Sequence, residues 1–126
     1  MSKIVLSVGQ CRPDGAAISY YMKTNFGASV IAVDLSDQAL AALETKPIDL
    51  VLINRKLDID MSDGLEILKS IRSTSSKREV PVMLVSNYAE WQVKAVQMGA
   101  TYGFGKAELN LPETRSRLAA ILEAES

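Results

Sequence analysis

Residues 47–54 read Pro47-Ile48-Asp49-Leu50-Val51-Leu52-Ile53-Asn54, a proline and then an apolar run that ends in an amide side chain. Apolar residues stand at consecutive positions between Asp49 and Asn54, so both faces of the predicted strand are apolar. A strand that is apolar on both faces suits the centre of a parallel sheet, where helices cover each side. We therefore predict that residues 49–54 form the central strand of an α/β domain.

Short apolar runs on either side of this segment alternate with stretches of helical periodicity. The runs predict further strands at residues 3–8, 29–33, 80–85 and 102–104. Helices are predicted over residues 13–26, 36–46, 65–72, 88–98 and 111–122, with Ser36 as the cap of the second helix and a polar loop at residues 73–79. This order is typical of a doubly wound parallel sheet of five strands, with five helices divided between its two faces. One such domain accounts for residues 1–126.

The composition of the chain excludes several classes of protein. It has 126 residues, of which 48% are hydrophobic and 23% are charged, and this is too apolar for a disordered chain. Its 14 basic and 15 acidic residues give a net charge of -1, without the basic excess of a nucleic-acid-binding protein. It has no histidine, which excludes histidine-based catalytic triads and histidine-ligated zinc.

The sequence also bears on location and redox state. It carries no secretory signal and no apolar stretch of the roughly 20 residues that span a membrane. We therefore expect a cytoplasmic protein with neither nucleic acid nor a membrane as its partner. The single cysteine, Cys11, has no partner for an internal disulfide. The neighbouring Arg12 favours a reactive thiolate there, although a lone cysteine is more often an inert small side chain.

The candidate site lies where the predicted strands end, because the carboxyl ends of parallel strands meet at one edge of the sheet. Residues 9–12, Gly9-Gln10-Cys11-Arg12, follow the first predicted strand, and Asn54-Arg55-Lys56 closes the third. Ser86-Asn87 follows the fourth strand, and Lys106 follows the fifth. We expect these side chains to share one cleft.

Four segments together resemble the receiver domain of response regulators, the phosphoacceptor module of bacterial two-component signalling. They are residues 47–54, Asp63-Gly64-Leu65-Glu66-Ile67-Leu68, Val80-Pro81-Val82-Met83-Leu84-Val85-Ser86, and residues 99–106 from Gly99-Ala100 to Lys106. The resemblance covers essentially the whole chain. It implies a flavodoxin-like sheet with the strand order 2-1-3-4-5.

The resemblance also implies a set of site residues, of which this chain keeps only some. A working receiver has an acceptor Asp after the third strand, two Mg²⁺-binding carboxylates after the first, a Ser or Thr after the fourth and a Lys after the fifth. Ser86 and Lys106 match the last two, whereas Asn54 stands at the acceptor position and Gly9 and Gln10 at the acid pair. A carboxamide is a poor nucleophile, and Mg²⁺ normally needs protein carboxylates. We therefore expect no catalytic residue, no metal, no cofactor and no enzymatic activity.

Asn54 has a structural role available in place of catalysis. We expect its amide to accept a hydrogen bond from Lys106 and to donate one to Ser86 or to a backbone carbonyl. The loop that follows it is two residues longer than in the usual receiver pattern and lacks the usual proline, and Ala107 replaces the proline that usually follows the Lys. The aromatic switch position of the family aligns with Gly103, so signal relay by aromatic rotation is not expected in this register.

Basic residues near the predicted cleft allow two interpretations. Arg12, Arg55 and Lys56 stand close in sequence to the site residues, so with Lys106 they would make the cleft cationic and able to hold an anion or a partner's carboxylate. In the other interpretation, which we favour, Arg55 and Lys56 point outward into solvent.

The acidic run in the long loop is also open to two interpretations. Asp58, Asp60 and Asp63 could hold a cation, but they lack the glycine and glutamate positions of a calcium loop. We favour a solvated loop in which the charge of Asp63 suits the start of the following helix.

Aromatic residues near the last strands are candidates for a protein interface. They are Tyr88, Tyr102 and Phe104. Trp91 is expected to share a buried stripe with Ala95 and Met98, which leaves Tyr88 exposed.

These features favour a stand-alone pseudo-receiver, which acts in phosphorelay signalling through protein–protein contacts without phosphorylation. Its partner would be another signalling protein or a second copy of the chain, the latter giving a homodimer. One alternative is a conventional phospho-receiver with a substitute acceptor such as Asp58 or Ser86. Another is a sensor of anions or small molecules that uses a cationic pocket around Asn54, Ser86 and Lys106.

Overall fold

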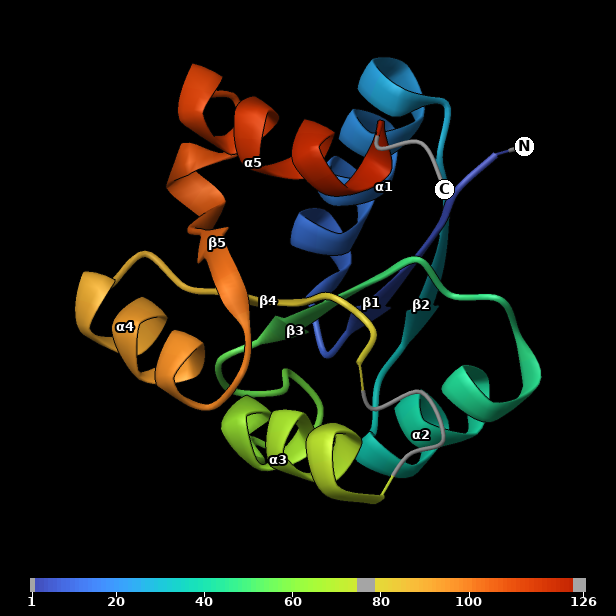
Figure 1. The fold of residues 1–126 in the computed structure, drawn as a ribbon, viewed down its shortest axis with the longest axis vertical. Helices are drawn as coiled ribbons and strands as arrows, with labels where there is room; N and C mark the ends of the chain where they lie inside the picture. Colours follow the sequence, from blue (N-terminus) through green and yellow to red (C-terminus); the bar gives the residue numbers. More distant parts are fainter. Residues whose placement is uncertain (1, 75–78, 124–126) are drawn as a thin grey trace.

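The computed structural model describes residues 2–74 and 79–123 as alternating strands and helices (Figure 1). The strands are β1 (Ile4–Val8), β2 (Ser29–Val33), β3 (Leu50–Asn54), β4 (Val82–Val85) and β5 (Thr101–Phe104). The helices are α1 (Arg12–Phe26), α2 (Ser36–Thr45), α3 (Gly64–Thr74), α4 (Ala89–Gln97) and α5 (Pro112–Leu122), with a short 3-10 helix η1 (Lys106–Glu108) before the last.

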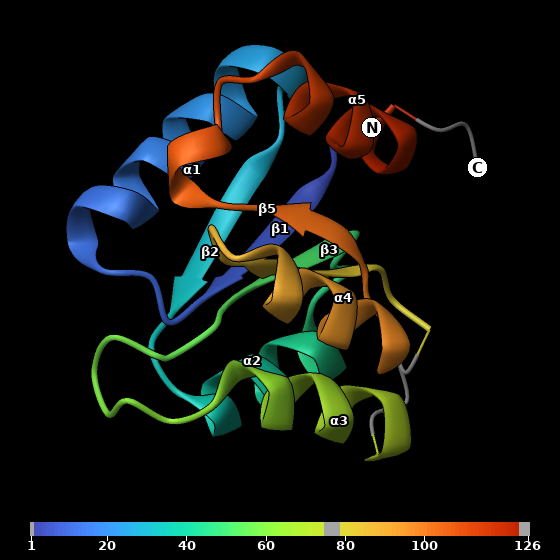
Figure 2. The ribbon, with the colours of Figure 1, turned by 90° about the vertical axis from the view of Figure 1, so that its left-hand side faces the viewer.

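The five strands form one parallel sheet in the order β2-β1-β3-β4-β5, which confirms the predicted flavodoxin-like order. Helices α1 and α5 cover one face of the sheet, and α2, α3 and α4 cover the other (Figure 1, Figure 2). Two separate apolar clusters fill the spaces between the sheet and these two helical layers.

The central strand β3 supplies both clusters, as its uninterrupted apolar sequence predicts. Val51 and Ile53 pack toward α2 and α3, while Leu50 and Leu52 pack toward α1 and α5. All four side chains are fully buried. Burial of an aliphatic side chain of this size contributes about 1.5–3 kcal/mol, so this strand fixes the position of the cleft at its carboxyl end.

The predicted element boundaries are correct to within a few residues, and the differences have local causes. Strand β4 begins at Val82, not at residue 80, because Pro81 has no N–H to donate; its carbonyl accepts from the N–H of Val51. The predicted polar loop starts too early: α3 extends to Thr74, and the hydroxyl of Ser73 donates to the carbonyl of Lys69. Residues 75–78 of that loop lie outside the described residues.

Two helix starts also differ from the sequence prediction. Ser36 is the first residue of α2 and does not cap it, because the side chain of Gln38 accepts from the N–H of Leu35, the residue before the helix. Leu111 likewise precedes α5, which begins at Pro112. Among the described residues, no helix is long and apolar enough to cross a membrane.

A buried glutamine holds the edge strand β5 against β4. The Nε2 of Gln92 donates to the carbonyls of Leu84 and Ser86 at 2.9 and 3.1 Å, and its Oε1 accepts from the N–H of Gly103 at 2.9 Å. The pairing of the two strands shifts register between Met83 and Val85, so a side-chain amide completes the hydrogen bonds that the ladder leaves unmade. Gln92 is 2% exposed and links α4 to the end of the sheet that carries the candidate site.

Candidate functional site

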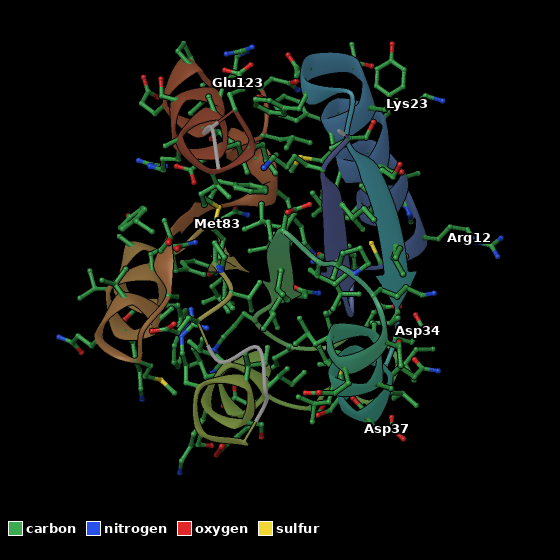
Figure 3. The ribbon with its side chains drawn as sticks, turned by 45° about the vertical axis from the view of Figure 1, so that its right-hand side comes forward. Arg12, Lys23, Asp34, Asp37, Met83 and Glu123 are labelled. Carbon is green, nitrogen blue, oxygen red and sulfur yellow. The ribbon has the colours of Figure 1, made fainter. Side chains whose placement is uncertain are left out.

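A hollow of about 470 Å³ lies at the carboxyl ends of β3 and β4. Six of the residues predicted to share a cleft line it: Asn54, Arg55, Lys56, Ser86, Asn87 and Lys106. The sequence prediction that these side chains share one cleft is thus correct for the third, fourth and fifth strands. Gln10 and Arg12 instead line a separate hollow of about 500 Å³ between α1 and the ends of β1 and β2. Arg12 reaches away from the body of the molecule there (Figure 3), so it adds no charge to the first hollow.

Asn54 donates the hydrogen bond that we expected, but it does not accept the one expected from Lys106. Its Nδ2 donates to the backbone carbonyl of Gly9 at 3.0 Å, which ties the end of β3 to the end of β1. The expected bond from Lys106 to Asn54 is wrong, because the ammonium of Lys106 pairs with Asp14 instead. An amide suits position 54 because its N–H can donate to the carbonyl of Gly9. A carboxylate there would place a second acceptor opposite that carbonyl.

Gly9 leaves space that another side chain fills. A Cβ at position 9 would overlap the Cδ2 of Leu57 and would lie 3.0 Å from the Cα of Leu57. Leu57 belongs to the long loop between β3 and α3 and is fully buried. Gly9 also has a φ of +74°, a conformation that favours glycine. An acidic side chain at this position would therefore need both a different backbone and a different loop.

Lys106 forms a small polar cluster with α1. Its Nζ lies 2.8 Å from the Oδ2 of Asp14, and the same oxygen accepts from the thiol of Cys11 at 2.9 Å. The thiol and the ammonium both donate to this carboxylate, so they hold the pKa of Asp14 below its usual 3.8. Sequence reasoning missed Asp14. Its place in the first turn of a helix, one turn after Cys11, was the signal that could have found it.

Ser86 is engaged with the backbone that follows it. It is 8% exposed, and its Oγ accepts from the N–H of Tyr88 at 3.2 Å, just before α4 begins. The Oδ1 of the next residue, Asn87, accepts a hydrogen bond from the N–H of Ala107 at 3.1 Å. These contacts tie the β4–α4 turn to η1, so Ser86 and Lys106 stand on segments that brace each other.

Arg55 does not point into solvent, which corrects the interpretation that we favoured from the sequence. Its guanidinium carbon lies 3.7 Å from the ring centroid of Trp91, and its Nη1 lies 3.2 Å from the Oδ1 of Asp63. Stacking on the indole of Trp91 and pairing with the carboxylate of Asp63 both stabilise the guanidinium in this position relative to a solvated one. Lys56 is exposed as expected, yet it lines the same hollow.

The acidic loop is organised by local hydrogen bonds. Asp63 accepts from the N–H of Leu65 at 2.9 Å, so its charge does sit at the start of α3 as predicted. Asp60 accepts from the hydroxyl and the N–H of Ser62, and these bonds lower the pKa of its carboxyl.

The three interface candidates differ in exposure. Tyr88 is 64% exposed, as expected, and Tyr102 is 37% exposed with the Arg117 guanidinium 4.7 Å from its ring centroid. The prediction that Phe104 belongs to an interface is wrong. It is fully buried and packs with Leu118 in the cluster beneath α1 and α5.

Trp91, Ala95 and Met98 occupy the predicted stripe on α4. Ala95 is fully buried, and Trp91 and Met98 are half-buried against the cluster beneath α2 and α3. Gln92, beside Trp91, was not singled out from the sequence, because no pattern separates a buried glutamine from a solvated one on a short helix.

The donor set of the cleft does not fit Mg²⁺. The positions that match the metal-binding and acceptor carboxylates carry Gly9, Gln10 and Asn54, and the space beside Gly9 is taken by Leu57. Among the acids near these positions, Asp14 is already bound by Lys106 and Cys11, and Asp58 lines the hollow on the loop after β3. Within residues 2–74 and 79–123, no three Asp, Glu, His or Cys side chains gather where they could hold a metal ion. Mg²⁺ is normally held by protein carboxylates, and none stands at positions 9, 10 and 54, where a receiver supplies them.

A family model described as "Response regulator receiver domain" matches residues 16–118. No curated protein matches the chain in sequence.

Solved receiver structures share the fold at low sequence identity. The receiver domain of a sensor histidine kinase from Pseudomonas aeruginosa PAO1, which has a magnesium ion coordinated in its active-site cleft, is 22% identical with a TM-score of 0.72; the match covers 98% of this chain and 96% of that one. A putative response regulator from Chloroflexus aurantiacus is 16% identical with a TM-score of 0.83, over 98% and 100% of the two chains. A chemotaxis protein from Vibrio cholerae is 19% identical with a TM-score of 0.71, over 98% of both chains.

Proposed function

Because this chain belongs to the response regulator receiver domain family, we propose that it acts in two-component signalling as a receiver that is not phosphorylated and works through protein contacts. Receivers in signalling act by binding other proteins, and the partner here is another signalling protein or a second copy of the chain. In this proposal residues 1–126 form a single non-enzymatic domain that works in the cytoplasm.

One observation carries the proposal: the amide of Asn54 donates to the carbonyl of Gly9 where a receiver needs a nucleophile. A carboxamide is too weak a nucleophile to take a phosphoryl group. Leu57 occupies the space beside Gly9, so a side chain at position 9 has no room to point there. Without the metal, the charge of an incoming phosphoryl group would have to be met by lysine and arginine alone.

The retained Ser86 and Lys106 also support a role without phosphorylation. Ser86 accepts from the N–H of Tyr88, and Lys106 is paired with Asp14, so both groups have partners in the absence of a phosphoryl group. A switch needs a ligand that binds one of two states more tightly than the other. These contacts favour one arrangement of the cleft, which presents a constant surface.

The decisive experiment measures the intact mass of the protein after incubation with Mg²⁺ and acetyl phosphate. We expect no phosphoryl adduct, while a receiver with an intact acceptor treated in parallel gains one. An adduct on this chain would overturn the proposal, and peptide mapping would then show whether Asp58 or Ser86 is the acceptor.

Trp91 provides an independent test for a metal. It is the single tryptophan of the chain and lines the cleft. We expect millimolar Mg²⁺ to leave its fluorescence without a saturable change. Saturable quenching would contradict the statement that the cleft holds no metal site.

An anion sensor is a second candidate function, because three cations and one acid line the hollow. The cations are Arg55, Lys56 and Lys106, and the acid is Asp58. Arg55 and Lys106 are paired with acids already, which weakens this candidate. Titration of Trp91 fluorescence with sulfate or phosphate, without metal, tests it directly.

A further inference from the structure

We propose that the protein binds a partner segment in which an acidic side chain stands next to an apolar one, through a surface that we call the loop–cleft surface. This surface consists of Lys56, Met61, Tyr88, Trp91 and Lys106, all of which line the hollow at the ends of β3 and β4. The inference rests on the proposed function, since it assumes that the cleft serves protein contacts.

The apolar part of the surface is exposed to an unusual degree. Met61 is 63% exposed and Tyr88 is 64% exposed, and Trp91 lies half-buried beside them on the wall of the same hollow. Methionine and aromatic residues are enriched at the centres of protein interfaces. Apolar side chains that meet at the mouth of one pocket therefore indicate a covered surface better than single exposed residues do.

The loop that carries Met61 is built to hold it in place. The N–H of Met61 donates to the carbonyl of Leu57, and the N–H of Leu57 donates to the carbonyl of Ser62, at 2.8 and 2.9 Å. Met61 has a φ of +61°, which costs a residue with a side chain about 1 kcal/mol. Figure 2 shows this loop, drawn in green, projecting from the edge of the sheet. A preformed loop loses less conformational entropy when a partner binds.

The charges that line the hollow, three basic side chains and the acid Asp58, favour an acidic partner. Lys56 and Lys106 are both exposed at the hollow, and Arg55 forms part of its wall. Lys56 forms no ion pair with any residue that the structure describes. A carboxylate at the mouth would meet the ammonium of Lys56, which donates to it without help from a metal, beside Lys106, whose ammonium is paired with Asp14. A free anion would use these charges but would leave Met61 and Tyr88 uncovered, so a protein segment fits the whole surface better.

The test uses three blocked hexapeptides that are identical except at one central position, which carries Glu, Gln or Lys between leucines. Binding is followed by the fluorescence of Trp91. We expect the Glu peptide to give a saturable change at millimolar concentration, about threefold to tenfold tighter than the Gln peptide, and the Lys peptide to bind weakest. Equal binding of the three peptides, or no binding of the Glu peptide, would overturn the inference.

Matched variants separate the surface from general charge effects. Lys56→Glu should abolish the preference for the Glu peptide, whereas Lys23→Glu, the same charge change at the far end of α1 (Figure 3), should keep it. Met61→Gly suits the positive φ and keeps the fold, yet it should weaken the Glu and Gln peptides equally. Loss of the preference in Lys23→Glu would show that only net charge matters.

Two further outcomes would show that something else occupies the loop–cleft surface. If sulfate at the same concentration produces the fluorescence change of the Glu peptide, the site holds a free anion. If the protein alone forms a dimer that Met61→Gly dissociates, the surface is covered by a second copy. Either result would overturn the inference. A phosphoryl adduct, by contrast, would overturn the proposed function whatever the peptides do, so the two failures are distinguishable.

Discussion

The side chain of Leu57 fills the space that a Cβ of Gly9 would occupy, so the end of β1 and the loop after β3 are in direct contact. This contact links two departures from the receiver pattern that stand far apart in the sequence. The loop from residue 55 is longer than usual, and the first strand ends without acids. Leu57 of this loop is fully buried and lies at the place where a side chain at position 9 would begin.

Gly9→Ala should reduce the free energy of unfolding by about 2–4 kcal/mol. The positive φ of Gly9 costs alanine about 1 kcal/mol, and the overlap with Leu57 adds the cost of overpacking, about 1–3 kcal/mol. Urea denaturation followed by circular dichroism measures the change. Gly15→Ala is the matched control, because its Cβ would meet only the Cβ of Gln10 at 3.7 Å, and it should be neutral or stabilising. Equal losses in the two variants would show that the contact with Leu57 is not the cause.

Asn54→Asp should not restore phosphorylation, because no acid stands at Gly9 or Gln10 to bind Mg²⁺. It should also lower stability at neutral pH by about 1–3 kcal/mol, since a carboxylate oxygen replaces the N–H that the carbonyl of Gly9 accepts. Intact mass after treatment with acetyl phosphate checks the first expectation, and urea denaturation checks the second. Asn110→Asp makes the same chemical change at an exposed position and should change stability little. A phosphoryl adduct on Asn54→Asp would show that the cleft needs only a nucleophile.

The stability that Asp14 contributes to the folded protein should be lost in acid. Hydrogen bonds from Cys11 and Lys106 lower the pKa of its carboxyl in the folded state below 3.8, so the folded protein binds fewer protons there than the unfolded chain. The stabilisation is therefore present above the unfolded pKa and is lost as the pH falls through the folded one. Asp14→Asn should be less stable than the parent at neutral pH, and the difference should shrink at about pH 3. A difference that stays constant between the two pH values would mean that the charge of Asp14 contributes nothing.

The regular part of the fold could be predicted from the sequence because its signals are local. The apolar run that ends at Asn54 gave the central strand, and Gly27, which ends α1 with a φ of +62°, acted as the expected stop signal. The helices of both layers followed from their apolar spacing. Boundary errors of one or two residues remain, as at the start of β4, where Pro81 has no N–H for the ladder.

The irregular part of the site could not be predicted because it depends on contacts between distant segments. The partner of Lys106 proved to be Asp14, on a helix at the other end of the sequence. Arg55 was expected to face solvent, yet Trp91 from α4 offers it a flat aromatic face. Phe104 and Tyr102 stand two residues apart on one strand, yet Phe104 is fully buried with Leu118, while Tyr102 is exposed beside Arg117.

Gln92→Leu should be the most destabilising of these substitutions, by about 3–5 kcal/mol. Leucine has a similar volume, but it leaves the N–H of Gly103 and the carbonyls of Leu84 and Ser86 without their partner in a buried place. Urea denaturation gives the loss, and hydrogen exchange of the Gly103 amide shows whether β5 separates from β4. Gln97→Leu, exposed on the same helix, should change stability by no more than about 0.5 kcal/mol.

Gln92→Glu tests the direction of these hydrogen bonds. A carboxylate can still accept from the N–H of Gly103, but it would face the carbonyls of Leu84 and Ser86 without a proton to donate. Burial next to two carbonyl oxygens should raise the pKa of the new carboxyl in the folded state. The folded variant then binds more protons than the unfolded one, so its stability should rise toward that of the parent as the pH falls from neutral to about 5. A loss that does not depend on pH would mean that the amide of Gln92 fills space without linking α4 to the two strands.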